Sequence, residues 1–176
     1  MAASAAELEH VRKVLNKLSA EAWSDVLKAF GDLPKWDQQI ARRALEGAWP
    51  ELIDTYGNMA ASFGADMFEE WADSLQIRRP VVDLAEGVDP ERATARAGWA
   101  LTTSDQLGNL RILADELVKQ PYRSTLHDSA LRSGAGWARV PTGSETCSFC
   151  LMLASRGGVY RSEQIAKLGT NGKKYH

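Results

Sequence analysis

Residues 51–75 read ELIDTYGNMAASFGADMFEEWADSL, and this stretch decides the fold class. Apolar side chains recur in it every three or four residues, which is the spacing of one face of an α-helix. The main stripe is Leu52, Tyr56, Met59, Phe63, Met67, Trp71 and Leu75, and a second, partial stripe is Ile53, Ala60, Gly64 and Phe68. The pattern predicts one long helix with a broad buried face, in which glycines permit close approach of another helix.

Two helices are predicted at the start of the chain. Ser4 and Glu7 have the spacing of a capping box, so the first helix is expected to begin at Ala5. Ser19 is placed to cap a second, short helix, and Gly31 is placed to end it.

A third helix is predicted to follow, with Pro34 in its first turn. Its inward-facing residues are expected to be Ile40, Ala44, Leu45 and Ala48. Trp49-Pro50 is expected to break or bend it, because proline lacks a backbone N–H and clashes with the preceding turn.

Beyond the long helix, residues 76–88 read as a connector with one extended piece. Asp89-Pro90 is a strong helix start, and Ser104 is expected to begin a further helix that Pro121 kinks or restarts. The apolar residues expected inside that last helix are Leu107, Leu110, Leu113, Ala114, Leu117 and Val118, continued by Tyr122, Leu126 and Ala130. His127 and Asp128 are not expected to face each other, because neighbouring helical residues point about 100° apart.

These patterns predict a mainly α protein with three regions. Residues 1–77 form an N-terminal helical region, residues 89–134 form a second helical region that joins the same body, and residues 135–176 form a small irregular α+β segment. The composition is that of an ordinary globular protein, with 44% hydrophobic and 25% charged residues. No run reaches the ~18 apolar residues of a membrane span, and the N-terminus does not have the pattern of a signal peptide.

Charge is unevenly distributed along the chain, although the net charge is only −2. Residues 132–176 contain seven basic and two acidic residues, whereas residues 1–131 contain 14 basic and 21 acidic residues. A basic end on an acidic body makes DNA or an acidic protein surface a candidate partner, and a solvated loop region is the alternative.

Both cysteines of the chain lie in the last region, as Cys147 and Cys150. Two thiolates on one tight turn, with the imidazole of His176 downstream, predict a zinc site that lacks one of the four ligands of a closed structural site. The residues leave other readings open: two buried thiols, a cysteine nucleophile or a redox pair.

The motifs around these cysteines resemble the MuF-like minor head proteins of tailed bacteriophages, and especially their actinobacteriophage branch. The resemblance rests on GWARVPTG (136–143), TCSFCLMLASRG (146–157), VYRS (159–162) and the closing KYH (174–176). The family signature is a cysteine pair, a histidine and then a Cys-x-Cys. The chain supplies Cys147, Cys150 and His176 and stops before any Cys-x-Cys, so we expect the natural protein to continue.

The resemblance implies a structural protein present in few copies inside the phage head, near the portal. It implies a role in head assembly and in DNA packaging or ejection, with the portal protein, other head proteins and packaged DNA as partners. Such a protein would be made in the bacterial cytoplasm, and several copies could surround a ring. Some relatives are described as capsid maturation proteases. The sequence shows no Ser-His-Asp arrangement at a recognisable elbow and no His-Glu-x-x-His motif, so we expect a non-enzyme and keep the protease as the alternative.

Overall fold

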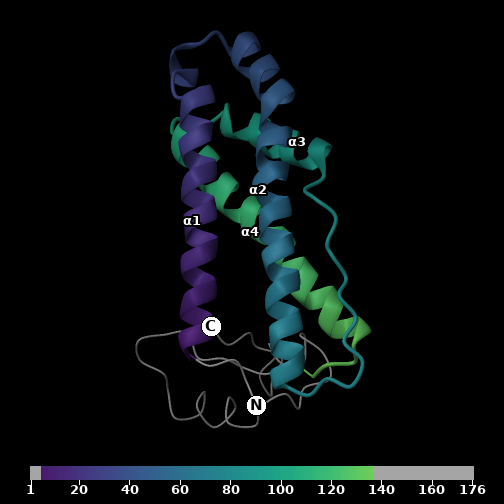
Figure 1. Cartoon of the computed structure of the whole chain (residues 1–176). Helices are drawn as coiled ribbons and strands as arrows, with labels where there is room; N and C mark the ends of the chain where they lie inside the picture. The colour runs from purple at the N-terminus through teal and green to yellow at the C-terminus, as the bar shows by residue number, and fades with distance from the viewer. Residues whose placement is uncertain (1–4, 137–176) are drawn as a thin grey trace, which may run out of the picture.

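The structure is a computed structural model that describes residues 5–136. Its elements are α1 (Ala5–Phe30), a 3-10 turn η1 (Leu33–Lys35), α2 (Gln38–Ser74), α3 (Pro90–Ala100) and α4 (Gln106–Arg132). Figure 1 shows α1 and α2 side by side as a hairpin, with α4 crossing them obliquely and α3 beside the upper half of α2. The prediction of a mainly helical body is confirmed, and the described residues contain no strand. The predicted α+β segment lies outside them, apart from Ala135 and Gly136.

The first two predicted helices are one continuous helix, α1. It is described from Ala5 onward and ends before Gly31, as predicted for the second helix, but the expected start at Ser19 is wrong. Ser19 is buried on the inner face of α1, between Leu15 and Ala22, because that buried face continues through this position to Phe30. A serine that caps a helix needs to lie outside its regular turns, and packing along the whole of α1 prevents this.

The predicted start of the third helix is also corrected. Pro34 lies in η1, and α2 begins four residues later behind Asp37, whose carboxylate accepts a hydrogen bond from the Gln39 N–H at 2.9 Å. Leu45 faces inward as expected, but Ile40 is 60% exposed and Ala48 is exposed.

Neither internal proline ends its helix. Pro50 lies inside α2, and Pro121 lies inside α4, so of the two alternatives expected at each proline the break and the restart are wrong, and the bend and the kink stay predictions. Each proline removes one helical hydrogen bond, but burial of its neighbours compensates. Trp49 and Ile53, on either side of Pro50, are both completely buried.

The broad buried face predicted for residues 51–75 is observed, and it is centred on the second stripe. Of the main stripe, Met67 is buried and Leu52, Tyr56, Phe63 and Trp71 are partly buried in the core, whereas the other two residues are exposed. Met59 is 51% exposed and Leu75 is 39% exposed. The buried positions from Ile53 onward are Ile53, Gly57, Ala60, Ala61, Gly64, Met67, Phe68 and Ala72. Small residues dominate this face because α4 lies very close to it: a Cβ added to Gly64 would stand 3.1 Å from the carbonyl oxygen of Tyr122.

Two hydrophobic clusters hold the helices together. The larger one joins the C-terminal half of α1, the N-terminal half of α2, α3 and the first half of α4 around Trp49 and Phe30. The smaller one joins the other halves of α1, α2 and α4 through Val11, Met67 and Tyr122. As predicted, Asp89 caps α3, and its carboxylate accepts hydrogen bonds from the N–H groups of the first turn. Within the described part of the chain, no helix is long and apolar enough to cross a membrane.

Candidate functional site

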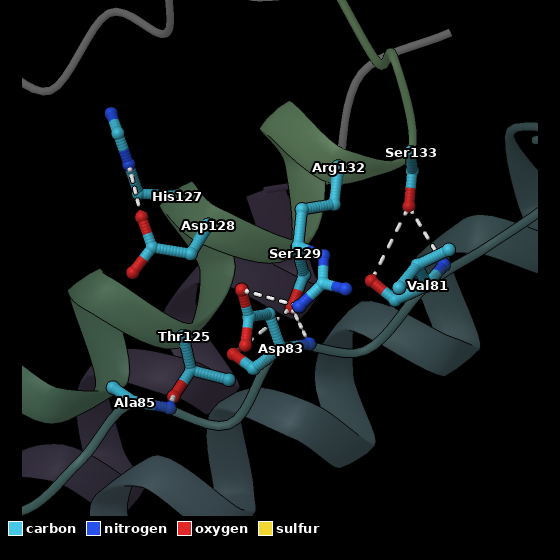
Figure 2. A network of polar contacts seen from close by, with 9 residues as sticks. All are labelled: Val81, Asp83, Ala85, Thr125, His127, Asp128, Ser129, Arg132 and Ser133. Atoms are coloured by element: carbon cyan, nitrogen blue, oxygen red, sulfur yellow. Dashed lines mark hydrogen bonds and ion pairs between the residues drawn. The ribbon is translucent and has the colours of Figure 1, made fainter.

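The connector between α2 and α3 lies along α4 and is tied to it by side-chain hydroxyls. Residues 77–89 contain no helix, as predicted for a connector. Three alternate backbone N–H groups donate to hydroxyls of α4 and of Ser133, the residue that caps its C-terminal end: Val81 to Ser133 Oγ at 2.8 Å, Asp83 to Ser129 Oγ at 2.9 Å, and Ala85 to Thr125 Oγ1 at 3.0 Å (Figure 2). We call this set the hydroxyl ladder.

The repeat distances of a helix and an extended chain explain the regularity of the hydroxyl ladder. Two residues of extended chain advance about 6.6 Å, and four residues of α-helix advance about 6.0 Å. Hydroxyls at every fourth position of α4 therefore meet every second N–H of the connector. Ser129 Oγ and Ser133 Oγ also lie 3.5 Å and 3.4 Å from the carbonyl oxygens of Asp83 and Val81, so each serine can bond both backbone groups of its partner.

Charged contacts secure the connector at two further points. Arg132 Nη1 lies 3.1 Å from Asp83 Oδ2, so an ion pair accompanies the hydroxyl ladder at the end of α4 (Figure 2). On the other side, the Val88 N–H donates to Asp54 Oδ1 of α2 at 3.2 Å. Thr125 and Ser129 are completely buried, so their hydroxyls act as backbone partners rather than as solvent-facing nucleophiles.

His127 and Asp128 do contact each other, contrary to the sequence expectation. His127 Nδ1 lies 2.8 Å from Asp128 Oδ1, because the two rotamers bring the side chains together although their Cα–Cβ bonds diverge. Figure 2 shows the pair on α4 with the His127 ring pointing away from the connector. Both side chains are partly exposed, at 38% and 45%, and the pair lies beside the hydroxyl ladder rather than in it.

The predicted zinc ligands Cys147, Cys150 and His176 lie outside the described residues, so the zinc site stays a prediction. Within residues 5–136, no group of three or more His, Cys, Asp or Glu side chains could hold a metal ion. What the structure does describe is the attachment of this segment: α4 ends at Arg132, and its last turns are bound to the connector.

Comparison with known proteins identifies the family. The model of the VG15 protein family matches residues 2–176. The chain belongs to the VG15 family. It is 58% identical over 136 residues to the Gene 15 protein of Mycobacterium phage D29, an alignment that covers 68% of this chain and 48% of that protein. It is 27% identical over 136 residues to the Gene 15 protein of Mycobacterium phage L5, covering 65% and 43%.

These relatives place the chain among bacteriophage proteins. The alignments span less than half the length of either relative. No solved structure matches the chain significantly.

A side-chain hydrogen bond joins α1 to α2, and it is expected to make the free energy of unfolding depend on pH in the alkaline range. The Tyr56 hydroxyl donates to Asp25 Oδ2 at 2.6 Å, and this bond to a carboxylate raises the pKa of Tyr56 to about 12. The pKa of Tyr56 in the folded state exceeds its unfolded value of about 10. The contribution of this hydrogen bond to the free energy of unfolding is therefore complete below pH ~10 and is lost as pH rises through ~12. Wild type should therefore be more stable than Tyr56→Phe at neutral pH, and the difference should shrink above pH ~10.

Urea unfolding of both proteins across that pH range measures the difference. A constant difference between them at every pH would contradict the assigned hydrogen bond. The Tyr122 phenol is a useful contrast, because burial alone raises the pKa of Tyr122.

Sequence reasoning missed the hydroxyl ladder. Its signal was present in Thr125, Ser129 and Ser133, which are spaced four apart beside the apolar face of a predicted helix. Hydroxyls in that pattern usually bond to the preceding turn of their own helix, so the spacing alone does not indicate an external partner.

Proposed function

We propose that this protein is a minor structural component of the phage head, located near the portal, with a role in head assembly and in DNA packaging or ejection. Its partners in this proposal are the portal protein and other head proteins, and the host cytoplasm is its location during assembly. The membership in a bacteriophage protein family carries the proposal. The motifs around Cys147 and Cys150, which resemble MuF-like minor head proteins, support the finer assignment.

The helical body fits a docking role in that proposal. Four helices share two hydrophobic clusters, and the connector is bound to α4 and α2 along its length. Such a body is a firm support at the point where α4 leads into the cysteine-containing segment. We expect the segment to make the specific contacts and the body to set its position.

The direct test uses phage particles that carry an affinity tag on this protein. Quantitative mass spectrometry of purified particles should find the protein at a low, fixed ratio to the portal protein, and portal complexes isolated from assembly intermediates should contain it. A protein that is absent from particles and from portal complexes would overturn the proposal. An untagged phage purified in parallel controls for adhesion of free protein.

Zinc binding by Cys147, Cys150 and His176 is a separate prediction. The purified full gene product should contain zinc, and Cys147→Ala should release it, because a tetrahedral site does not tolerate loss of a thiolate. Native mass spectrometry and metal analysis measure the loss. Removal of zinc should destabilise the C-terminal segment and leave the α1–α4 body folded, since the body contains no candidate ligand cluster within residues 5–136. Zinc at wild-type level in both Cys147→Ala and Cys150→Ala would contradict the site.

The alternative function is a capsid maturation protease or another enzyme that uses the cysteine turn. Cys147→Ala and Cys150→Ala distinguish it from the structural role. If head-protein processing stops while the protein folds and enters particles, the enzyme is favoured. If processing continues and only the C-terminal segment loosens, the structural role is favoured.

Contact of residues 132–176 with DNA is a further part of the proposal, since this region contains seven basic and two acidic residues. Counterion release requires such binding to weaken steeply between ~50 and ~200 mM salt. Binding of duplex DNA that does not respond to salt in that range would remove this partner.

A further inference from the structure

The outer face of the α3–α4 hairpin carries a concentration of positive charge. Arg96 forms a two-point ion pair with Glu116, with Nη1–Oε1 and Nη2–Oε2 distances of 3.1 Å and 2.6 Å. The Arg96 hydrogen bond lowers the pKa of Glu116, and the charges of Arg123 and Arg92 lower it further. Unlike Arg96, neither Arg92 nor Arg123 forms an ion pair with another residue of the described part.

Two large apolar side chains lie on the same face. Trp99 is 58% exposed and Ile112 is 65% exposed. Trp99 lies three residues after Arg96, and Ile112 lies four residues before Glu116, so the helical register places both about one turn from the ion pair, toward the α3–α4 turn. Exposed tryptophan beside arginine is the composition of an interface centre rather than of a solvated surface. We call Arg92, Arg96, Trp99, Ile112 and Arg123 the basic face.

The C-terminal half of α2 carries the opposite charge. Asp66, Glu69, Glu70 and Asp73 are spaced three and four residues apart, all are exposed, and together they form one acidic stripe. No lysine or arginine occurs between Arg43 and Arg78, whereas seven acidic residues do. None of the four forms an ion pair with another residue of the described part.

The acidic stripe also has an apolar end. Met59, seven residues before Asp66, is 51% exposed. On the basic face, Trp99 lies seven residues after Arg92. In both helices, about 10 Å therefore separates a charged position from a large apolar one. An antiparallel arrangement would set Arg92 against Asp66 and Trp99 against Met59, a favourable sulfur–aromatic pair.

We propose that the basic face of one copy of this chain binds the acidic stripe of a second copy. Within one molecule the α3 part of the basic face lies beside the upper half of α2, whereas the acidic stripe lies toward the lower end of α2 (Figure 1). Each copy therefore presents both surfaces, and the contact is head to tail. Such contacts close into a ring or continue as an open chain. The inference does not depend on the proposed function.

The experiment uses charge reversal of the full chain, with mass measured by analytical ultracentrifugation at low salt. One variant, Arg92→Glu with Arg123→Glu, reverses the basic face and leaves the Arg96–Glu116 pair intact. The other, Asp66→Lys with Glu70→Lys, reverses the acidic stripe. Wild type should associate, and each variant alone should be monomeric, because like charges then meet at the contact.

Mixing the two variants should restore association, since each contact in an alternating assembly again joins opposite charges. A control that reverses exposed charge elsewhere, Lys13→Glu with Arg43→Glu, should associate as wild type does. Thermal unfolding of each variant verifies that the body is folded.

Three results would overturn the inference. The first is a wild-type monomer at every concentration up to about 1 mM, the range of weak specific contacts. The second is association that neither reversal changes or that mixing fails to restore. The third is a monomer whose duplex DNA binding is lost on reversal of the basic face, which would assign that face to nucleic acid.

Discussion

A triple variant, Thr125→Val with Ser129→Ala and Ser133→Ala, should lower the free energy of unfolding by about 3 kcal/mol. It removes the three hydroxyls of the hydroxyl ladder, and each backbone N–H left without an acceptor at a partly buried site costs ~1 kcal/mol or more. Valine keeps the shape of Thr125 and alanine fits the space of serine, so the loss reports the hydrogen bonds rather than cavities. Urea unfolding measures it.

Hydrogen exchange tests the location of the effect. The Val81, Asp83 and Ala85 amides should lose protection in the triple variant, because they are the donors of the hydroxyl ladder. Ser124→Ala is the matched control: it removes a hydroxyl from the same helix, one residue from Thr125, and should leave the connector amides protected. Equal loss of protection in both proteins would show that α4 as a whole, not the hydroxyl ladder, had been disturbed.

A side chain at Gly64 should have a comparable effect at the contact between α2 and α4. A Cβ there would stand 3.1 Å from the Tyr122 carbonyl oxygen, 3.2 Å from its ring and 3.3 Å from Thr125 Cβ. Gly64→Val should therefore lower the free energy of unfolding by about 3 kcal/mol, because the helices must separate to accept it. Chemical denaturation compared with wild type measures the change.

Gly47 provides the control in the same helix. A Cβ at Gly47 meets nothing within 4 Å, and the residue is exposed. Gly47→Ala should therefore stabilise the protein by ~0.5–1 kcal/mol, the ordinary gain in helix propensity. If Gly64→Ala also stabilised the protein, the close approach of α2 and α4 would be wrong.

Periodicity predicted the helices of the body and the broad buried face of α2, but not where that face is centred. The stripe from Leu52 to Leu75 is the more apolar one, so sequence reasoning placed it in the core. The structure centres the buried face on Gly57, Ala60 and Gly64 and leaves much of the Leu52–Leu75 stripe at its edge, because helix-to-helix distance depends on the smallest side chains at the contact. The hydrophobicity of a stripe does not indicate how closely a second helix approaches it. The local sequence of α2 also does not indicate which helix will pack against it.

The prolines show the same limit. Pro50 and Pro121 carry a strong local signal against helix, yet α2 and α4 continue through both. Burial of Trp49, Ile53 and Pro121 itself outweighs one missing hydrogen bond at each site. At Asp89-Pro90 no tertiary contact among the described residues opposes the local preference for a helix start, and the predicted start of α3 is confirmed.

The candidate site was predictable only in part. The cysteine turn is a local motif, so the sequence alone indicates Cys147, Cys150 and His176, which stay a prediction. The hydroxyl ladder joins residues 40 to 52 positions apart, and only the path of the connector brings them together.

The acidic stripe lies near the C-terminal end of α2, where the macrodipole already places negative potential, and the last turn contains no basic residue. The carboxylates of the stripe and the negative end of the macrodipole therefore repel each other, which destabilises the last turns of α2. Moderate salt should slow amide exchange in the last turns of α2 instead of accelerating it, the reverse of a helix end held by ion pairs. Any cationic surface that binds these turns would reduce the same repulsion and stabilise the end of the helix.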